Sequence, residues 1–117
     1  MKKLALAALC TALSATPAFA TGGMICRTAG AHPVEIAVVI SHTAVPSVVS
    51  ARLTDNGRVI PVSVAQSWLE PRELRLDLTD KQALRHELRL RVTASGRTFD
   101  GSLWRLGKRR WVRCREA

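Results

Sequence analysis

The sequence predicts an all-β domain, a small antiparallel sandwich or barrel of about eight short strands. From Pro33 to Arg115, apolar residues alternate with polar ones at a period of two, which is the periodicity of β-strands. Turn sequences such as Asn-Gly and Ser-Gly recur between the alternating runs. No stretch has the extended 3.6-residue periodicity of an amphipathic helix. These three observations favour one compact β-domain.

The first twenty residues have the pattern of a cleavable secretion signal. Lys2 and Lys3 precede the apolar run 4–13, and the segment ends in Ala18-Phe19-Ala20. The apolar run is too short for a transmembrane helix, which needs about 20 residues. We therefore predict a signal peptide over residues 1–20 and a single β-domain over residues 21–117. The mature product is expected in the periplasm or outside the cell, with no transmembrane segment.

Removal of the signal leaves two cysteines, Cys26 and Cys114, near the two ends of the domain. An even number of cysteines in an exported chain predicts a disulfide, here one that links the N- and C-terminal strands. A metal site and a free nucleophilic thiol are the weaker alternatives, because metal ligands commonly occur at short spacing. The chain-entropy model values so long a closed loop at roughly 4 to 5 kcal/mol.

The segment 55–58, Asp-Asn-Gly-Arg, predicts a tight β-hairpin. Asn-Gly accepts positive φ at both central positions of a type I′ turn, so Asn56 and Gly57 are expected to form the loop. The register then places six apolar side chains on one face. The expected pairs are Leu53 with Ile60, Ala51 with Val62, and Val49 with Val64.

Other segments predict further strands and one helical turn. Both faces of the stretch 34–41 are largely apolar, which favours a central strand covered on both sides. Residues 73–78 and 88–92 alternate leucine or valine with charged residues, as half-exposed strands do. Between them, 79–82 fits the Thr-x-x-Gln capping box of a short helical turn. Trp68, in an apolar stretch, is expected in the core.

The last hairpin carries an aromatic and cationic group of residues. With Gly107 and Lys108 as its loop residues, Trp104 and Trp111 are expected to be cross-strand partners. The other expected pairs are Leu103 with Val112 and Gly101 with Cys114. Phe99, Leu103, Val112 and Cys114 would then face the core. The opposite face would carry Trp104, Trp111, Arg109, Arg113 and Arg115.

The charge of the mature chain suggests an anionic partner. Sixteen Lys and Arg residues against nine Asp and Glu give a net charge of +7, and fourteen of the sixteen are arginines. The arginine fork suits carboxylate and phosphate. We predict that one face binds a lipopolysaccharide, an anionic lipid or an acidic glycan of the cell envelope, because export argues against nucleic acid. The candidate binding residues are Trp104, Trp111, Arg109, Arg113, Arg115, Arg89 and Arg91.

Two alternatives compete with that interpretation. The arginines could serve only to protect sheet edges from aggregation. The tryptophans could instead be buried, with arginine stems covering their rings.

The sequence predicts a protein that is not an enzyme and that needs no metal or cofactor. Its mature histidines, His32, His42 and His86, are scattered rather than set at metal-ligand spacing. It contains no Gly-x-Ser-x-Gly nucleophile elbow, no glycine-rich phosphate loop and no convincing carboxylate pair.

The segment Thr93–Gly101, followed by Leu103-Trp104 and Gly107-Lys108, resembles the C-terminal part of bacterial C-type lysozyme inhibitors. The resemblance covers about the last quarter of the chain, and the order of Lys and Gly in the turn is reversed. It implies an exported β-barrel in which Ser95 and Lys108 would probe a lysozyme cleft. The alternative function is therefore a periplasmic inhibitor of an envelope-attacking enzyme such as lysozyme. A charge of +7 would repel a cationic lysozyme at long range.

Overall fold

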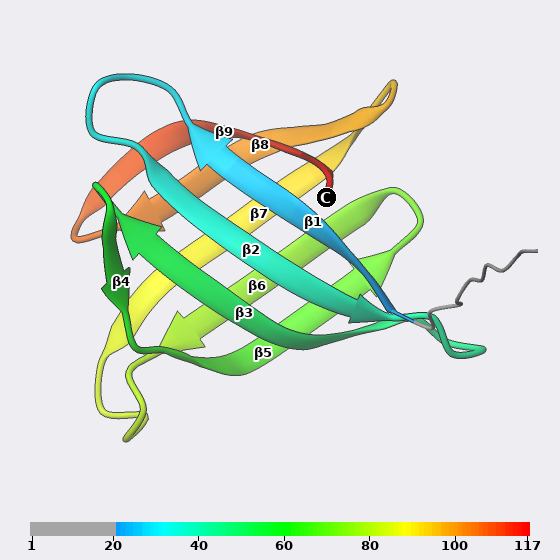
Figure 1. The fold of residues 1–117 in the computed structure, drawn as a ribbon, viewed down its shortest axis with the longest axis horizontal. Helices are drawn as coiled ribbons and strands as arrows, with labels where there is room; N and C mark the ends of the chain where they lie inside the picture. The colour runs from blue at the N-terminus through cyan, green and yellow to red at the C-terminus, as the bar shows by residue number, and fades with distance from the viewer. Residues whose placement is uncertain (1–20) are drawn as a thin grey trace, which may run out of the picture.

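The computed structural model describes residues 21–117, which form a nine-stranded antiparallel sheet curled into a half-barrel (Figure 1). The all-β prediction is confirmed, with nine strands rather than about eight. The predicted signal peptide lies outside the described residues. Among residues 21–117 no helix is long and apolar enough to cross a membrane. The strands are β1 (Thr21–Thr28), β2 (Val34–Ser41), β3 (Ser47–Asp55), β4 (Arg58–Ile60), β5 (Ser63–Glu70), β6 (Glu73–Thr79), β7 (His86–Ser95), β8 (Thr98–Arg105) and β9 (Lys108–Glu116).

The strand order is β4-β3-β2-β1-β9-β8-β7-β6-β5. The curl brings β1, β2 and β3 in front of the strands of the other half (Figure 1). β4 and β5 are consecutive in the chain yet form the two edges of the sheet. Inward side chains fill the curl as the core, and outward side chains meet solvent, which explains the period of two. The fully buried side chains include Ile36, Val38, Leu53, Leu74, Leu76, Leu78, Leu88, Leu90, Val92, Leu103 and Val112.

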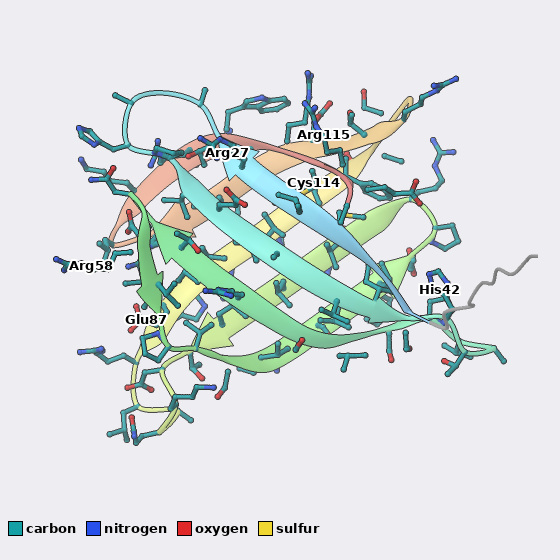
Figure 2. All side chains as sticks on the ribbon, in the orientation of Figure 1. Arg27, His42, Arg58, Glu87, Cys114 and Arg115 are labelled. Carbon is teal, nitrogen blue, oxygen red and sulfur yellow. A yellow bond between two sulfur atoms is a disulfide. The ribbon has the colours of Figure 1, made fainter. Side chains whose placement is uncertain are left out.

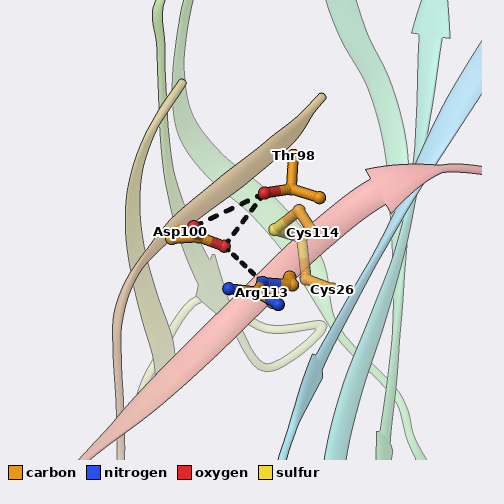
Figure 3. Close-up of a disulfide and its surroundings, with 5 residues drawn as sticks. All are labelled: Cys26, Thr98, Asp100, Arg113 and Cys114. Carbon is orange, nitrogen blue, oxygen red and sulfur yellow. Dashed lines mark hydrogen bonds and ion pairs between the residues drawn. A yellow bond between two sulfur atoms is a disulfide. The ribbon is translucent and has the colours of Figure 1, made fainter. Parts of the chain in front are cut away.

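β1 and β9 are neighbours, and a disulfide joins them. Cys26 lies directly opposite Cys114 in the ladder, and both side chains are completely buried. The predicted disulfide is confirmed, and Figure 3 shows it beside Asp100 and Arg113. The bond lies at the junction between the β1–β4 half and the β5–β9 half of the sheet.

The first hairpin was predicted correctly only near its turn. Asn56 and Gly57 have φ values of 51° and 82°, and Leu53 pairs with Ile60. β4 ends at Ile60, because Pro61 offers no N–H to a ladder and the chain crosses to the other edge. The longer pairing was therefore wrong: no ladder joins Ala51 to Val62 or Val49 to Val64, and Val64 instead pairs with Leu78.

Two further local predictions were wrong. β2 lies between β1 and β3, as expected of a central strand, but its outward Val39 is 39% exposed because a single curled sheet leaves its outer face in solvent. Residues 80–85 form a turn without a helix. The Asp80 carboxylate accepts hydrogen bonds from the backbone N–H of Leu84 (2.7 Å) and of Arg85 (3.3 Å), and Ala83 has φ of 60°. Such side-chain hydrogen bonds offer the backbone an alternative to helix.

The β8–β9 turn uses Leu106 and Gly107, so the predicted loop residues were wrong by one position. Their φ values of 52° and 76° nearly match those of the Asn-Gly turn, and Arg105 pairs with Lys108. Moving the turn by one residue changes each cross-strand partner by two residues, which leaves every side chain on its predicted face. The three predicted pairs were therefore wrong. The observed pairs are Trp104 with Arg109, Ser102 with Trp111, Leu103 with Arg110, Gly101 with Val112, and Phe99 with Cys114.

Replacing Leu106 with asparagine should raise the free energy of unfolding by about 1 kcal/mol, because leucine is disfavoured at positive φ and asparagine tolerates it. Leu106 is 77% exposed, so the substitution sacrifices little burial. Urea unfolding of the oxidised domain measures the change. Leu84→Asn is the control, since Leu84 is equally exposed but has no positive φ. An equal response of the two variants would contradict the assignment to turn geometry.

Candidate anion-binding face

The outer surface of β5–β9 carries two adjoining cross-strand rows of polar and aromatic side chains. Their residues point outward because the next residue along each strand from β6 to β9 lies in the core or turns inward. We call the two rows together the tryptophan–arginine face. The first row is Trp68, Arg75, Arg91, Ser102 and Trp111, and the second is Gln66, Asp77, Arg89, Trp104 and Arg109.

All three tryptophans of the chain lie on this face. Trp68 is 53% exposed and Trp111 is 59% exposed, whereas Trp104 is half-buried between Arg89 and Arg109. The predicted core position of Trp68 was therefore wrong. Trp68 lies on an edge strand and points outward from a single-layer sheet, where no second layer covers it. Its outward direction follows from pairing with Arg75, which sequence periodicity alone does not reveal.

Two of the four arginines on this face, Arg75 and Arg89, are already bound to carboxylates. The Arg75 Nε donates to Glu73 at 2.7 Å, which raises the pKa of Arg75, and the Arg89 Nε donates to Asp77 at 3.0 Å. Arg91 lies between Arg75 and Ser102 in the first row. It forms no ion pair or side-chain hydrogen bond with any residue of the described part of the chain. Its guanidinium is therefore available to an external anion.

Two grooves meet at Arg91. One is lined by Trp68, Arg75, Asp77, Arg89 and Arg91, together with neighbouring strand residues. The second is lined by His86, Arg89, Arg91 and Trp104. Because they share Arg89 and Arg91, the grooves form one continuous depression from Trp68 to Trp104.

A third groove lies around Trp111, lined also by Arg27, Arg113 and Arg115. The Arg113 Nε donates to Asp100 at 2.8 Å (Figure 3). That bond is the main reason why the pKa of Asp100 lies below its ordinary value and the pKa of Arg113 above its own. The predicted binding residues thus fall into two neighbourhoods, one around Trp104 and one around Trp111.

Two arginines of the last hairpin bind groups from distant segments of the chain instead. Arg105 is 8% exposed at its side chain and forms ion pairs with Asp55 at 2.7 Å and Glu87 at 2.9 Å. Arg110 donates to the backbone carbonyls of His32 and Ala29, each at 3.0 Å. Glu87 is labelled at this end of the barrel in Figure 2. Because the partners of Arg105 and Arg110 come from distant segments, no local sequence pattern distinguishes these two arginines from the others on the last hairpin.

The structure does not bring Ser95 and Lys108 together. Ser95 begins the β7–β8 turn and Lys108 ends the β8–β9 turn, at opposite ends of β8 (Figure 1). Their partners Thr98 and Arg105 are seven residues apart, which corresponds to about 23 Å along a strand. One cleft would have to span that length to contact both.

The histidines lie in three separate places. His32 is 3.1 Å from the Asn56 Oδ1, and the His86 Nε2 is 3.4 Å from the Asp77 Oδ1, while His42 follows β2. Within residues 21–117, no three His, Cys, Asp or Glu side chains are arranged to hold a metal ion.

Fold and surface together define a small disulfide-linked β-domain with an aromatic, arginine-rich outer face. No protein-family model matches the chain, and no curated protein or solved structure matches it significantly. A functional assignment therefore depends on the chemistry of that face.

Proposed function

We propose that the mature protein is a non-enzymatic binding domain of the cell envelope, periplasmic or secreted, whose tryptophan–arginine face binds an anionic envelope component. The single observation that carries the proposal is the unpaired Arg91 at the junction of two grooves, with Trp68 at one end and Trp104 at the other. A guanidinium without an internal carboxylate can give both of its donor edges to a ligand. The net charge of +7 would draw such a ligand toward the protein.

The buried disulfide and the composition support the same proposal. A disulfide forms and persists in oxidising compartments such as the periplasm or the cell exterior. In those compartments the abundant polyanions are lipopolysaccharide, anionic lipids and acidic glycans. The exposed rings of Trp68 and Trp111 add apolar contact area next to the cations, so the face suits an amphipathic anion better than a simple salt.

Replacing Arg91 with glutamine should weaken binding of the anionic component about tenfold, because a charge-assisted hydrogen bond contributes about 1.5 to 3 kcal/mol. The mature, oxidised protein is titrated with lipopolysaccharide, anionic vesicles and acidic glycans at low and moderate salt. Binding should weaken as salt rises, since exposed charges are screened.

Arg52→Gln is the matched control for this experiment. Arg52 is an exposed outward arginine on β3, in the other half of the sheet, and it has no ion pair with the described residues. The Arg52→Gln substitution removes the same charge as Arg91→Gln but leaves the tryptophan–arginine face unchanged. Equal loss of affinity in both variants would show that binding depends on net charge alone and would overturn the assigned face.

A further inference from the structure

We infer that the ligand is an acidic polysaccharide chain lying across β5–β8, with sugar rings on Trp68 and Trp104 and an anionic group on Arg91. The inference depends on the proposed function and names the chemical class of its ligand. It begins from the continuity of the two grooves, which share Arg89 and Arg91. A single anion would need one groove, whereas a chain would occupy both.

The dimensions of the face indicate an extended ligand. Trp68 lies on β5 and Trp104 on β8, three strand steps apart, which is about 14 Å at the usual strand separation. A single sugar or a free phosphate is too short to contact both rings. The groove runs across the strands rather than along one strand, so an added β-strand of a partner would not follow it.

The order of chemical groups also fits a glycan. Along the groove, the Trp68 indole comes first, then Arg75 and the Asp77 carboxylate that Arg89 neutralises, then Arg91, whose guanidinium has no such partner in the described chain, and then the Trp104 indole. An acidic glycan presents apolar C–H faces of its rings and carboxylate or sulfate groups in alternation. Indole faces pack against the C–H faces of the sugar rings, and the planar guanidinium binds a carboxylate or sulfate in a bidentate contact.

A bilayer surface fits this face less well. Interfacial binding needs a contiguous apolar surface that can enter the headgroup region. Here Arg75 and Arg91 stand between Trp68 and Trp111 in the same row. The most exposed leucines, Leu84 and Leu106, lie in turns and not on the tryptophan–arginine face.

Isothermal titration calorimetry with acidic sugars of increasing length tests the inference. The probes are galacturonic acid and its oligomers, alginate oligomers and a sulfated glycosaminoglycan. Affinity should rise with chain length and then level off once both rings are covered. Trp68→Ala should weaken binding of long oligomers about tenfold, the size of one aromatic stacking contact, and leave galacturonic acid unaffected. Arg91→Gln should weaken binding at every length.

Controls separate this inference from the proposed function. Methyl-esterified oligogalacturonate keeps the rings but removes the charge and should bind at least tenfold more weakly. Leu84→Ala is an apolar control away from the face and should bind as the native protein does. If anionic vesicles, lipopolysaccharide or a single-stranded oligonucleotide bind through Arg91 while no acidic glycan does, the glycan inference is overturned. If the probe that binds in this way is the vesicles or the lipopolysaccharide, the proposed function survives. If no probe responds to Arg91→Gln, both are overturned.

Discussion

Arg105→Met should lower the free energy of unfolding by about 3 kcal/mol, the loss expected when one partner of a buried ion pair is removed. The Arg105 side chain is 8% exposed and bridges two carboxylates. It also donates to the backbone carbonyl of Glu87 at 3.1 Å. Its removal leaves Glu87, itself 8% exposed, with only the largely exposed Arg85 as an ion-pair partner, at 3.1 Å. Because Asp55 belongs to the β3–β4 hairpin and Glu87 to β7, the loss should also loosen this end of the barrel.

Urea unfolding of the oxidised protein, monitored by tryptophan fluorescence, measures this effect. Arg91→Met is the matched control, since it removes the same group from an exposed site without an ion pair in the described chain, and it should change stability by less than about 0.5 kcal/mol. Adding Asp55→Asn and Glu87→Gln to Arg105→Met should recover part of the loss, because the neutral amides no longer carry the negative charges that Arg105 balanced. Similar values for Arg105→Met and Arg91→Met would contradict a structural role for Arg105.

The face of each side chain on the late strands could be predicted from local alternation, whereas its exact partner could not. Inward Leu103 and Val112 and outward Trp104 and Trp111 were placed correctly, because a strand alternates its two faces regardless of its neighbour. The predicted cross-strand partners were wrong because leucine rarely adopts positive φ, so nothing in the sequence indicated a turn at Leu106. At Asn56 the same positive φ is occupied by asparagine, the residue that commonly adopts it, and the adjacent pairing of Leu53 with Ile60 was predicted correctly.

Whether an outward face of the sheet is exposed depends on which other elements cover it, and the topology of the fold determines those elements. The apolar outward residues of β2 and the position of Trp68 were misjudged for this reason. A sheet that curls on itself needs no second layer, so outward Val39 and Trp68 remain in solvent.

Contacts between distant segments also decide which arginines form internal ion pairs and which remain free to bind a ligand. Arg105 meets Asp55, fifty positions away in the sequence, and no local pattern records that contact. Arg91 and Arg89 have the same spacing pattern on one strand, yet only Arg89 has a carboxylate opposite it, at Asp77. The sequence alternation therefore placed Arg89 and Arg91 on one outward face, but it could not distinguish the paired arginine from the unpaired one.

Removing the disulfide should produce the largest loss of stability. The double variant Cys26→Ala/Cys114→Ala opens a crosslink between residues 88 positions apart, and the chain-entropy model values that constraint at roughly 4 to 5 kcal/mol. Two buried sulfur atoms are removed as well, which adds a smaller packing cost. A domain of this size has a total stability of about 5 to 15 kcal/mol, so the variant should unfold at a much lower urea concentration.

The same variant shows which half of the sheet the binding site depends on. The grooves between Trp68 and Trp104 are built by β5–β8, whereas the disulfide joins β1 to β9. At low temperature and without denaturant, the folded fraction should therefore bind its ligand within about threefold of the native affinity, a change below 1 kcal/mol. Circular dichroism gives the folded fraction and calorimetry the affinity. A stability loss under about 1 kcal/mol would show that the unfolded chain is already compact, while loss of binding by fully folded protein would move the site toward β1 and β9, around Trp111.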